Sequence, residues 1–138
     1  MRPPDQGGGR SLAFPDYDQA VAFHNALAER MGAEDWGPIE EQRLKSALER
    51  AHQATAQRGD LISSGAFMLF GLIRDKPFGK GSIETGLALT LAFLMRHGAG
   101  VEAPDEEIAG ISIGISEGEV YAGMVEMWLR EYARPIRF

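Results

Sequence analysis

Apolar residues recur along this chain at intervals of three and four positions, the spacing of one face of an α-helix. The first such stripe consists of Tyr17, Ala20, His24, Leu27 and Met31. Pro15 and Asp16 precede it as an N-terminal signal, and Gly32 follows it as a natural stop. The pattern therefore predicts a helix that begins near residues 15–16 and ends at residue 31.

Two later segments are apolar on nearly every side, which is typical of buried helices. Residues 61–73 form the first, with Asp60 as a candidate N-cap. The second lies in a helix expected over residues 82–97, which is apolar nearly all round from Leu87 to Met95 and which Gly98 ends. A helix with a single apolar face precedes them, from Pro38 to a stop at Gly59. We expect the two apolar helices to be the centre of a bundle.

Two more helices are expected near the end of the chain. One begins at Pro104 and carries isoleucines on one face. The other covers residues 119–133 and has a stripe of Val120, Met124, Met127 and Trp128. We interpret this stripe as core, with a dimer face as the alternative if the helix packs loosely.

No alternating apolar run indicates a β-strand, so the predicted fold class is all-α. We expect a compact single-domain bundle of about six helices over residues 12–138. Residues 1–11 are rich in proline and glycine and are predicted to be a flexible N-terminal tail.

The composition narrows the classes of function. The 138 residues include no cysteine, which excludes a thiolate metal site and a cysteine nucleophile. The formal net charge of −6 argues against non-specific nucleic-acid binding, because that binding depends on neutralising phosphates. No apolar stretch reaches the ~20 residues of a membrane span, and the first residues lack a signal-peptide pattern. We expect a cytoplasmic protein that binds neither nucleic acid nor membranes.

The polar loop between the two apolar helices, residues 74–81, is the best candidate for binding chemistry. It contains Lys76, Gly79, Lys80 and Gly81, and it leads straight into a helix N-terminus. Exposed N–H groups and the positive end of a helix dipole attract anions. A tight turn with solvated lysines explains the same residues, and from the loop alone it is the favoured interpretation.

Residues 76–89 resemble the central motif of the Fic/Doc (death-on-curing) family. That motif reads His-x-Phe-x-Asp/Glu-Gly/Ala-Asn-Lys-Arg-Thr and leads into an apolar helix. Phe78, Gly81 and Thr85 match it, and Pro77 is also common in the family. The similarity covers roughly residues 14–133 and is to the short Doc-type branch. It implies the compact all-α Fic/Doc bundle, with transfer of AMP or a phosphoryl group from a Mg²⁺-bound nucleotide to a protein hydroxyl.

Five working positions of that motif are changed in this chain. Lys76 stands where the family has its general-base histidine, and Lys80 where it has the acid that binds Mg²⁺. The residues at the positions that hold phosphates are Ser82, Ile83 and Glu84. A lysine is protonated at neutral pH and cannot ligate Mg²⁺, while a glutamate repels phosphate. The comparison indicates a degenerate motif.

Two functions are consistent with this interpretation. The favoured one is a pseudoenzyme, a relative of the toxin family that has lost nucleotide-dependent transfer. It would bind a protein or peptide partner, such as an antitoxin-like segment or a target protein, and homodimers are a further option. No catalytic residue, metal or cofactor is expected in that case.

The alternative is an active Fic/Doc-type transferase that modifies a protein hydroxyl with altered active-site residues and uses ATP and Mg²⁺. Its anion or ligand loop would consist of Lys76, Phe78, Gly79, Lys80, Gly81, Ser82 and Thr85.

The three histidines do not suggest a metal site. His24, His52 and His97 lie on different predicted helices and have no paired spacing. His24 lies on the apolar stripe of the first helix, so we interpret it as a hydrogen-bonded packing residue rather than a catalyst.

Overall fold

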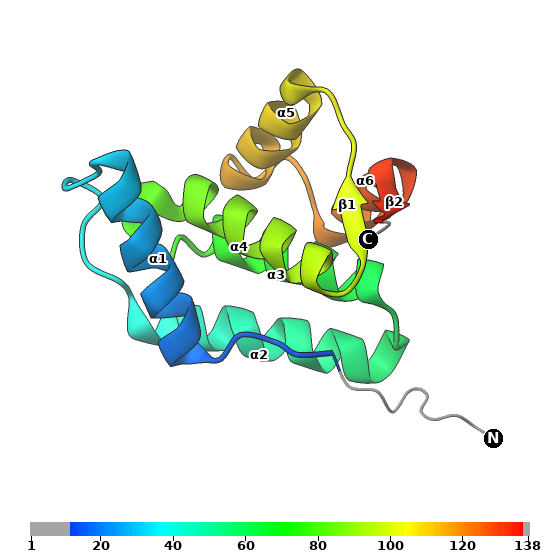
Figure 1. Cartoon of the computed structure of the whole chain (residues 1–138), viewed down its shortest axis with the longest axis horizontal. Coiled ribbons are helices and arrows are strands. Elements are labelled where there is room, and N and C mark those ends of the chain that lie inside the picture. The colour runs from blue at the N-terminus through cyan, green and yellow to red at the C-terminus, as the bar shows by residue number, and fades with distance from the viewer. Residues whose placement is uncertain (1–11, 137–138) are drawn as a thin grey trace.

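Six α-helices make up most of the part of the chain that the computed structural model describes, residues 12–136 (Figure 1). They are α1 (Tyr17–Met31), α2 (Glu41–Arg58), α3 (Leu61–Arg74), α4 (Ser82–Arg96), α5 (Asp105–Ser116) and α6 (Ala122–Tyr132). A short 3₁₀ turn, η1 (Gly79–Gly81), precedes α4, and two short strands, β1 (Ala99–Val101) and β2 (Ala133–Pro135), pair with each other. The predicted all-α bundle is confirmed. The tail predicted at residues 1–11 lies outside the described residues.

Local signals in the sequence explain where the early helices begin and end. The side chain of Asp16 accepts a hydrogen bond from the Gln19 N–H group (2.8 Å), and the Gln19 side chain accepts one from the Asp16 N–H group (2.9 Å). This reciprocal pair satisfies two N–H groups that have no partner inside the helix. Asp60 caps α3 in a similar way through the Ser63 N–H group. Gly32 ends α1 with a φ of 63°, a backbone conformation that glycine adopts without strain.

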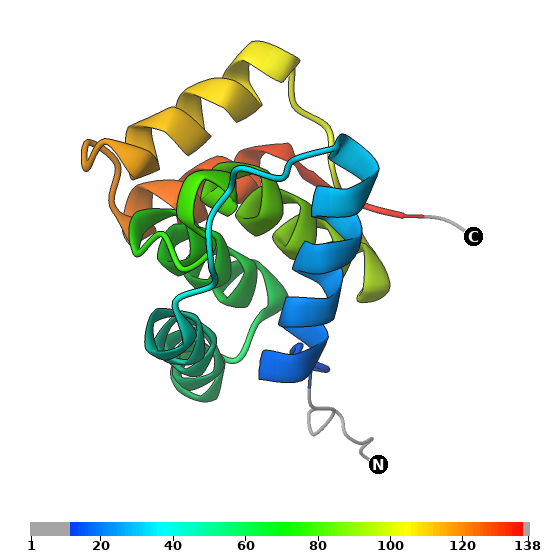
Figure 2. The same ribbon diagram turned by 90° about the vertical axis from the view of Figure 1, so that its left-hand side faces the viewer.

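Helix α3 is the centre of the bundle. It packs against α2, α4, α5 and α6, whereas α1 crosses α4 on the outside of the molecule (Figures 1 and 2). Its side chains Met68, Leu69, Leu72 and Ile73 are almost fully buried. Burying each large apolar side chain contributes about 1.5–3 kcal/mol to folding. The sequence-based expectation that α3 is a central, buried helix is confirmed.

The length of α3 fits a buried helix of a bundle. It has 14 residues, fewer than the ~20 that a helix needs to cross a bilayer. Within residues 12–136, no helix is both long and apolar enough for a membrane span.

The small sheet was not predicted. Gly100 of β1 lies opposite Arg134 of β2 in an antiparallel pair. Three-residue strands are too short to show an alternating pattern, and the two strands are far apart in the sequence. The sheet holds residues 133–136 beside the C-terminal end of α4, where the Ile136 N–H group donates to the Gly98 carbonyl (2.9 Å).

The prediction that the methionines of α6 belong to the core is wrong. Met124 is 48% exposed and Met127 is 74% exposed. The buried residues of α6 are Val125 and Leu129, one helical turn apart, and Trp128 is half-buried beside them. Because α6 has apolar residues on two sides, its periodicity alone did not determine which side faces the core.

Candidate functional site

The segment that joins α1 to α2 covers the turn between α3 and α4, where the motif-like residues lie (Figure 2). The Lys80 N–H group donates to the Trp36 carbonyl (3.0 Å), and the Glu40 N–H group donates to the Pro77 carbonyl (2.8 Å). The Trp36 side chain is buried against Gly81, where an added Cβ would come closer than 3.0 Å to three carbons of the indole ring. The indole therefore occupies the space that a side chain or a ligand atom at Gly81 would need.

Each backbone N–H group from residue 78 to residue 82 already has an acceptor in the protein. That of Phe78 donates to the Ser82 Oγ atom (3.0 Å). The N–H groups of Gly79, Gly81 and Ser82 donate to carbonyls of the same turn. The N–H group of Lys80 donates to the Trp36 carbonyl in the segment that covers the turn. An anion site at a turn relies on free N–H groups, and these five are engaged. The side chains of Lys76 and Lys80 add positive charge to this turn.

Lys76 joins this turn to the C-terminal end of α5. Its Nζ atom donates to the carbonyl of Ser116 (3.0 Å) and to the Ser116 Oγ atom (3.1 Å). A cation is favourable at this position because the last carbonyls of a helix carry partial negative charge. The backbone of Lys76 has a φ of 53°, in the left-handed region, which costs a residue with a Cβ atom about 1–2 kcal/mol.

A surface pocket of about 470 Å³ opens beside the turn. It is lined by Trp36, Lys76, Gly79, Lys80, Ser82, Ile83 and Ser116. Four of the five changed motif positions thus share one pocket, whereas Glu84 is exposed and is not part of its lining. No carboxylate lines the pocket, so it lacks the ligands that Mg²⁺ prefers. In residues 12–136 as a whole, no three His, Asp or Glu side chains are placed to hold a metal ion.

The two remaining motif residues, Phe78 and Thr85, lie in the core beneath the turn. The Phe78 ring stacks on the imidazole of His24, with centroids 4.6 Å apart and planes at 14°. The His24 Nδ1 atom and the Thr85 Oγ1 atom form a hydrogen bond of 3.0 Å. Burial lowers the pKa of His24, which favours the neutral imidazole. The interpretation of His24 as a hydrogen-bonded packing residue is confirmed.

The environment of His24 predicts how stability depends on pH. We expect the free energy of unfolding to fall as the pH is lowered below about 6.5, the pKa of an unperturbed histidine. Unfolding then allows His24 to take up a proton that burial opposes in the folded protein. Above that pH, the imidazole is neutral in both states and contributes no pH dependence.

Urea unfolding at pH 7.5 and pH 5.5 measures this effect. Burial also lowers the pKa of His97, so the contribution of His24 is isolated by repeating both measurements on the His24→Gln variant. The loss of stability between the two pH values should be smaller in the variant. An equal loss in both proteins would show that His24 does not cause it.

Sequence reasoning missed two residues of this site, Trp36 and Ser116. Trp36 had a usable signal, since it is a single large aromatic residue within a short polar loop and such residues are rarely left in solvent. No signal in the sequence indicates Ser116, because its contact with Lys76 depends on where the end of α5 lies in the folded chain.

No model of a protein family matches the chain, and no curated protein sequence matches it.

Proposed function

We propose that this chain is a degenerate Fic/Doc-like protein that acts by binding another protein and no longer carries out nucleotide-dependent AMP or phosphoryl transfer. The observation that carries the proposal is an exposed apolar face on α6, which we call the α6 face. It consists of Tyr121, Met124 and Met127, which are 67%, 48% and 74% exposed.

The spacing and chemistry of the α6 face suit a protein partner. Met124 and Met127 are three positions apart and so are neighbours on the helix surface, and Tyr121, the N-cap residue of α6, precedes Met124 by the same interval. Large apolar side chains gathered on a surface commonly mark an interaction site. Methionine suits such a site because its unbranched, polarizable side chain adapts to different partners.

The turn between α3 and α4 supports the loss of transfer chemistry. Phosphoryl and nucleotidyl transfer depend on Mg²⁺ and on donors placed around the phosphates. The pocket at this turn has no carboxylate, its backbone N–H groups are engaged, and Lys76 is held by the end of α5. Each of these features is unfavourable for a Mg²⁺-nucleotide.

Site-specific photo-crosslinking in cells tests the partner. A photoreactive amino acid at position 127 should give a discrete crosslinked product, and the same group at position 42 on exposed α2 should give none. Adding Met124→Lys should remove the product and lower thermal stability only slightly, because Met124 is 48% exposed and its Sδ atom accepts a single long hydrogen bond from the Tyr121 N–H group. A product of twice the chain's mass would identify the partner as a second copy. The absence of any product specific to position 127 would contradict the proposal.

The alternative, a transferase with altered active-site residues, is favoured by one observation. Lys76 adopts a left-handed backbone conformation beside the 470 Å³ pocket, and strained residues are frequent at functional sites. Calorimetric titration with ATP, with and without Mg²⁺ at low ionic strength, separates the two functions. We expect no heat of binding at millimolar ATP. Saturable binding that Lys80→Ala abolishes would instead favour the transferase.

A further inference from the structure

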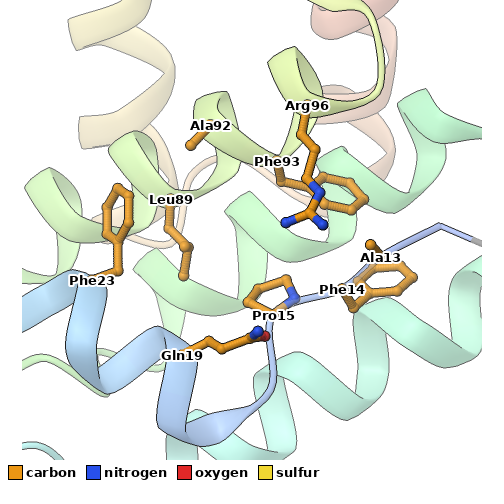
Figure 3. Close-up of a pocket in the computed structure, with 9 residues that line it drawn as sticks. All are labelled: Ala13, Phe14, Pro15, Gln19, Phe23, Leu89, Ala92, Phe93 and Arg96. Carbon is orange, nitrogen blue, oxygen red and sulfur yellow. The ribbon is translucent and has the colours of Figure 1, made fainter.

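A second pocket, lined by residues from the middle and the C-terminal end of α4, has a composition that suits a ligand. It lies between the segment that precedes α1, the first turns of α1 and the outer side of α4 (Figure 3). Its volume is about 280 Å³. The apolar part of its lining comes from Phe14, Phe23, Leu89 and Phe93, with Ala92 at its edge.

Contacts within the protein hold the wall of this pocket in place. The rings of Phe14 and Phe93 are stacked, with centroids 5.0 Å apart and planes at 24°. The Ala13 N–H group donates to the His97 Nε2 atom (3.1 Å) and so ties the segment before α1 to the end of α4. A pocket whose walls are already ordered loses little conformational entropy when it binds a ligand.

Two polar side chains face this pocket, and both can donate hydrogen bonds. In Figure 3, the Arg96 guanidinium reaches from α4 toward the segment before α1, and the Gln19 amide lies on the other side. Arg96 forms no ion pair with any carboxylate of residues 12–136. The Gln19 carbonyl oxygen already accepts from the Asp16 N–H group, which leaves its NH₂ group as the donor. No acidic side chain lines the pocket.

We propose that this pocket binds a small carboxylate with an apolar body. The body lies among Phe14, Phe23, Leu89 and Phe93, and the carboxylate pairs with Arg96, whose planar guanidinium matches a carboxylate in geometry. A dry cavity of about 150 Å³ holds benzene, so 280 Å³ accommodates roughly ten non-hydrogen atoms. Octanoate has this size and both of these chemical features. The site is separate from the turn between α3 and α4 and from the α6 face.

Titration of the full chain with octanoate, followed by NMR chemical shifts, tests the proposal. We expect saturable binding with a dissociation constant on the order of 0.1–1 mM, with shifts concentrated at the pocket. 1-Octanol, which lacks the negative charge, should bind the unmodified protein at least about tenfold more weakly than octanoate does. Octanoate should bind the Arg96→Gln variant more weakly than the unmodified protein by a similar factor. The matched control is Arg30→Gln. Arg30 is an arginine in the last turn of α1 that does not line the pocket, so its loss should leave the affinity unchanged.

A second variant tests the position of the binding site without changing any charge. Ala92 is exposed at the pocket's edge, so Ala92→Phe should fill the pocket without disturbing the core and should abolish binding. Undetectable octanoate binding would overturn the proposal. Equal affinity of Arg96→Gln and the unmodified protein would also overturn it, as would unchanged binding by Ala92→Phe, because the molecule would then bind elsewhere.

Discussion

Replacement of Gly81 by alanine is expected to destabilise the protein by about 2–4 kcal/mol, because one added methyl group displaces a buried indole. The Gly81 backbone has a φ of −93°, which alanine adopts without strain, so the cost is steric. The added Cβ would lie closer than 3.0 Å to carbons of the Trp36 ring. Either the indole leaves its site against His24 or the turn moves away from its covering segment. The midpoint of thermal unfolding should fall by roughly 5–15 °C.

A matched glycine and a double-mutant cycle give this measurement its controls. Gly110 lies inside α5 with open space around its Cα atom, so Gly110→Ala should stabilise the protein by up to about 1 kcal/mol. Gly81→Ala should cost clearly less in a Trp36→Ala background, because the clash is then gone. If Gly81→Ala proved as harmless as Gly110→Ala, the indole would not be held against the turn as described.

The helices were predictable from the sequence because their signals are local. The Asp16 capping box and the stop at Gly32 lie within α1 or next to it, and the structure has both. Two helix starts were predicted three residues too early, at residues 38 and 119. In the structure, the Glu40 N–H group donates to the Pro77 carbonyl, and the Glu119 N–H group turns back to the Gly114 carbonyl. These hydrogen bonds hold both segments outside the helices, and the first of them comes from tertiary structure.

The candidate site was predictable only in part for the same reason. Its turn was recognisable from its lysines, its glycines and the motif-like spacing of Phe78 and Thr85. The position of Trp36 over this turn was not predictable from the sequence, because it depends on how the segment between α1 and α2 crosses a turn that is distant in the sequence. The sequence likewise did not show which side of α6 is exposed. Met124 and Val125 are adjacent apolar residues, and only the packing of the helix determines which of them faces solvent.

Five substitutions at the turn are expected to create measurable affinity for Mg²⁺-ATP. They are Lys76→His, Lys80→Asp, Ser82→Asn, Ile83→Lys and Glu84→Arg, the residues of the Fic/Doc motif. An aspartate at position 80 gives Mg²⁺ a carboxylate ligand, and the lysine and arginine give the phosphates charged donors. New side chains must supply these contacts because the backbone N–H groups of the turn are engaged. The formal net charge stays at −6, so any gain in affinity comes from the placement of charge.

Calorimetric titration compares this variant with the unmodified chain, after thermal unfolding has shown that both are folded. The unmodified chain should give no heat of binding, whereas the variant should bind ATP at millimolar concentration or below. A four-fold variant that keeps Glu84 should bind at least about tenfold more weakly, because its carboxylate lies in the first turn of α4 and repels phosphate.

Trp36→Ala separates the two ways in which the five-fold variant can fail. If the variant is folded and binds no ATP, but binds once Trp36→Ala is added, the indole over Gly81 blocks the phosphate site. Nucleotide binding at this turn would then be opposed by a steric cause as well as an electrostatic one. If neither protein binds ATP, the five changed side chains do not account for the missing nucleotide site, and the turn has diverged from a phosphate-binding geometry in its backbone.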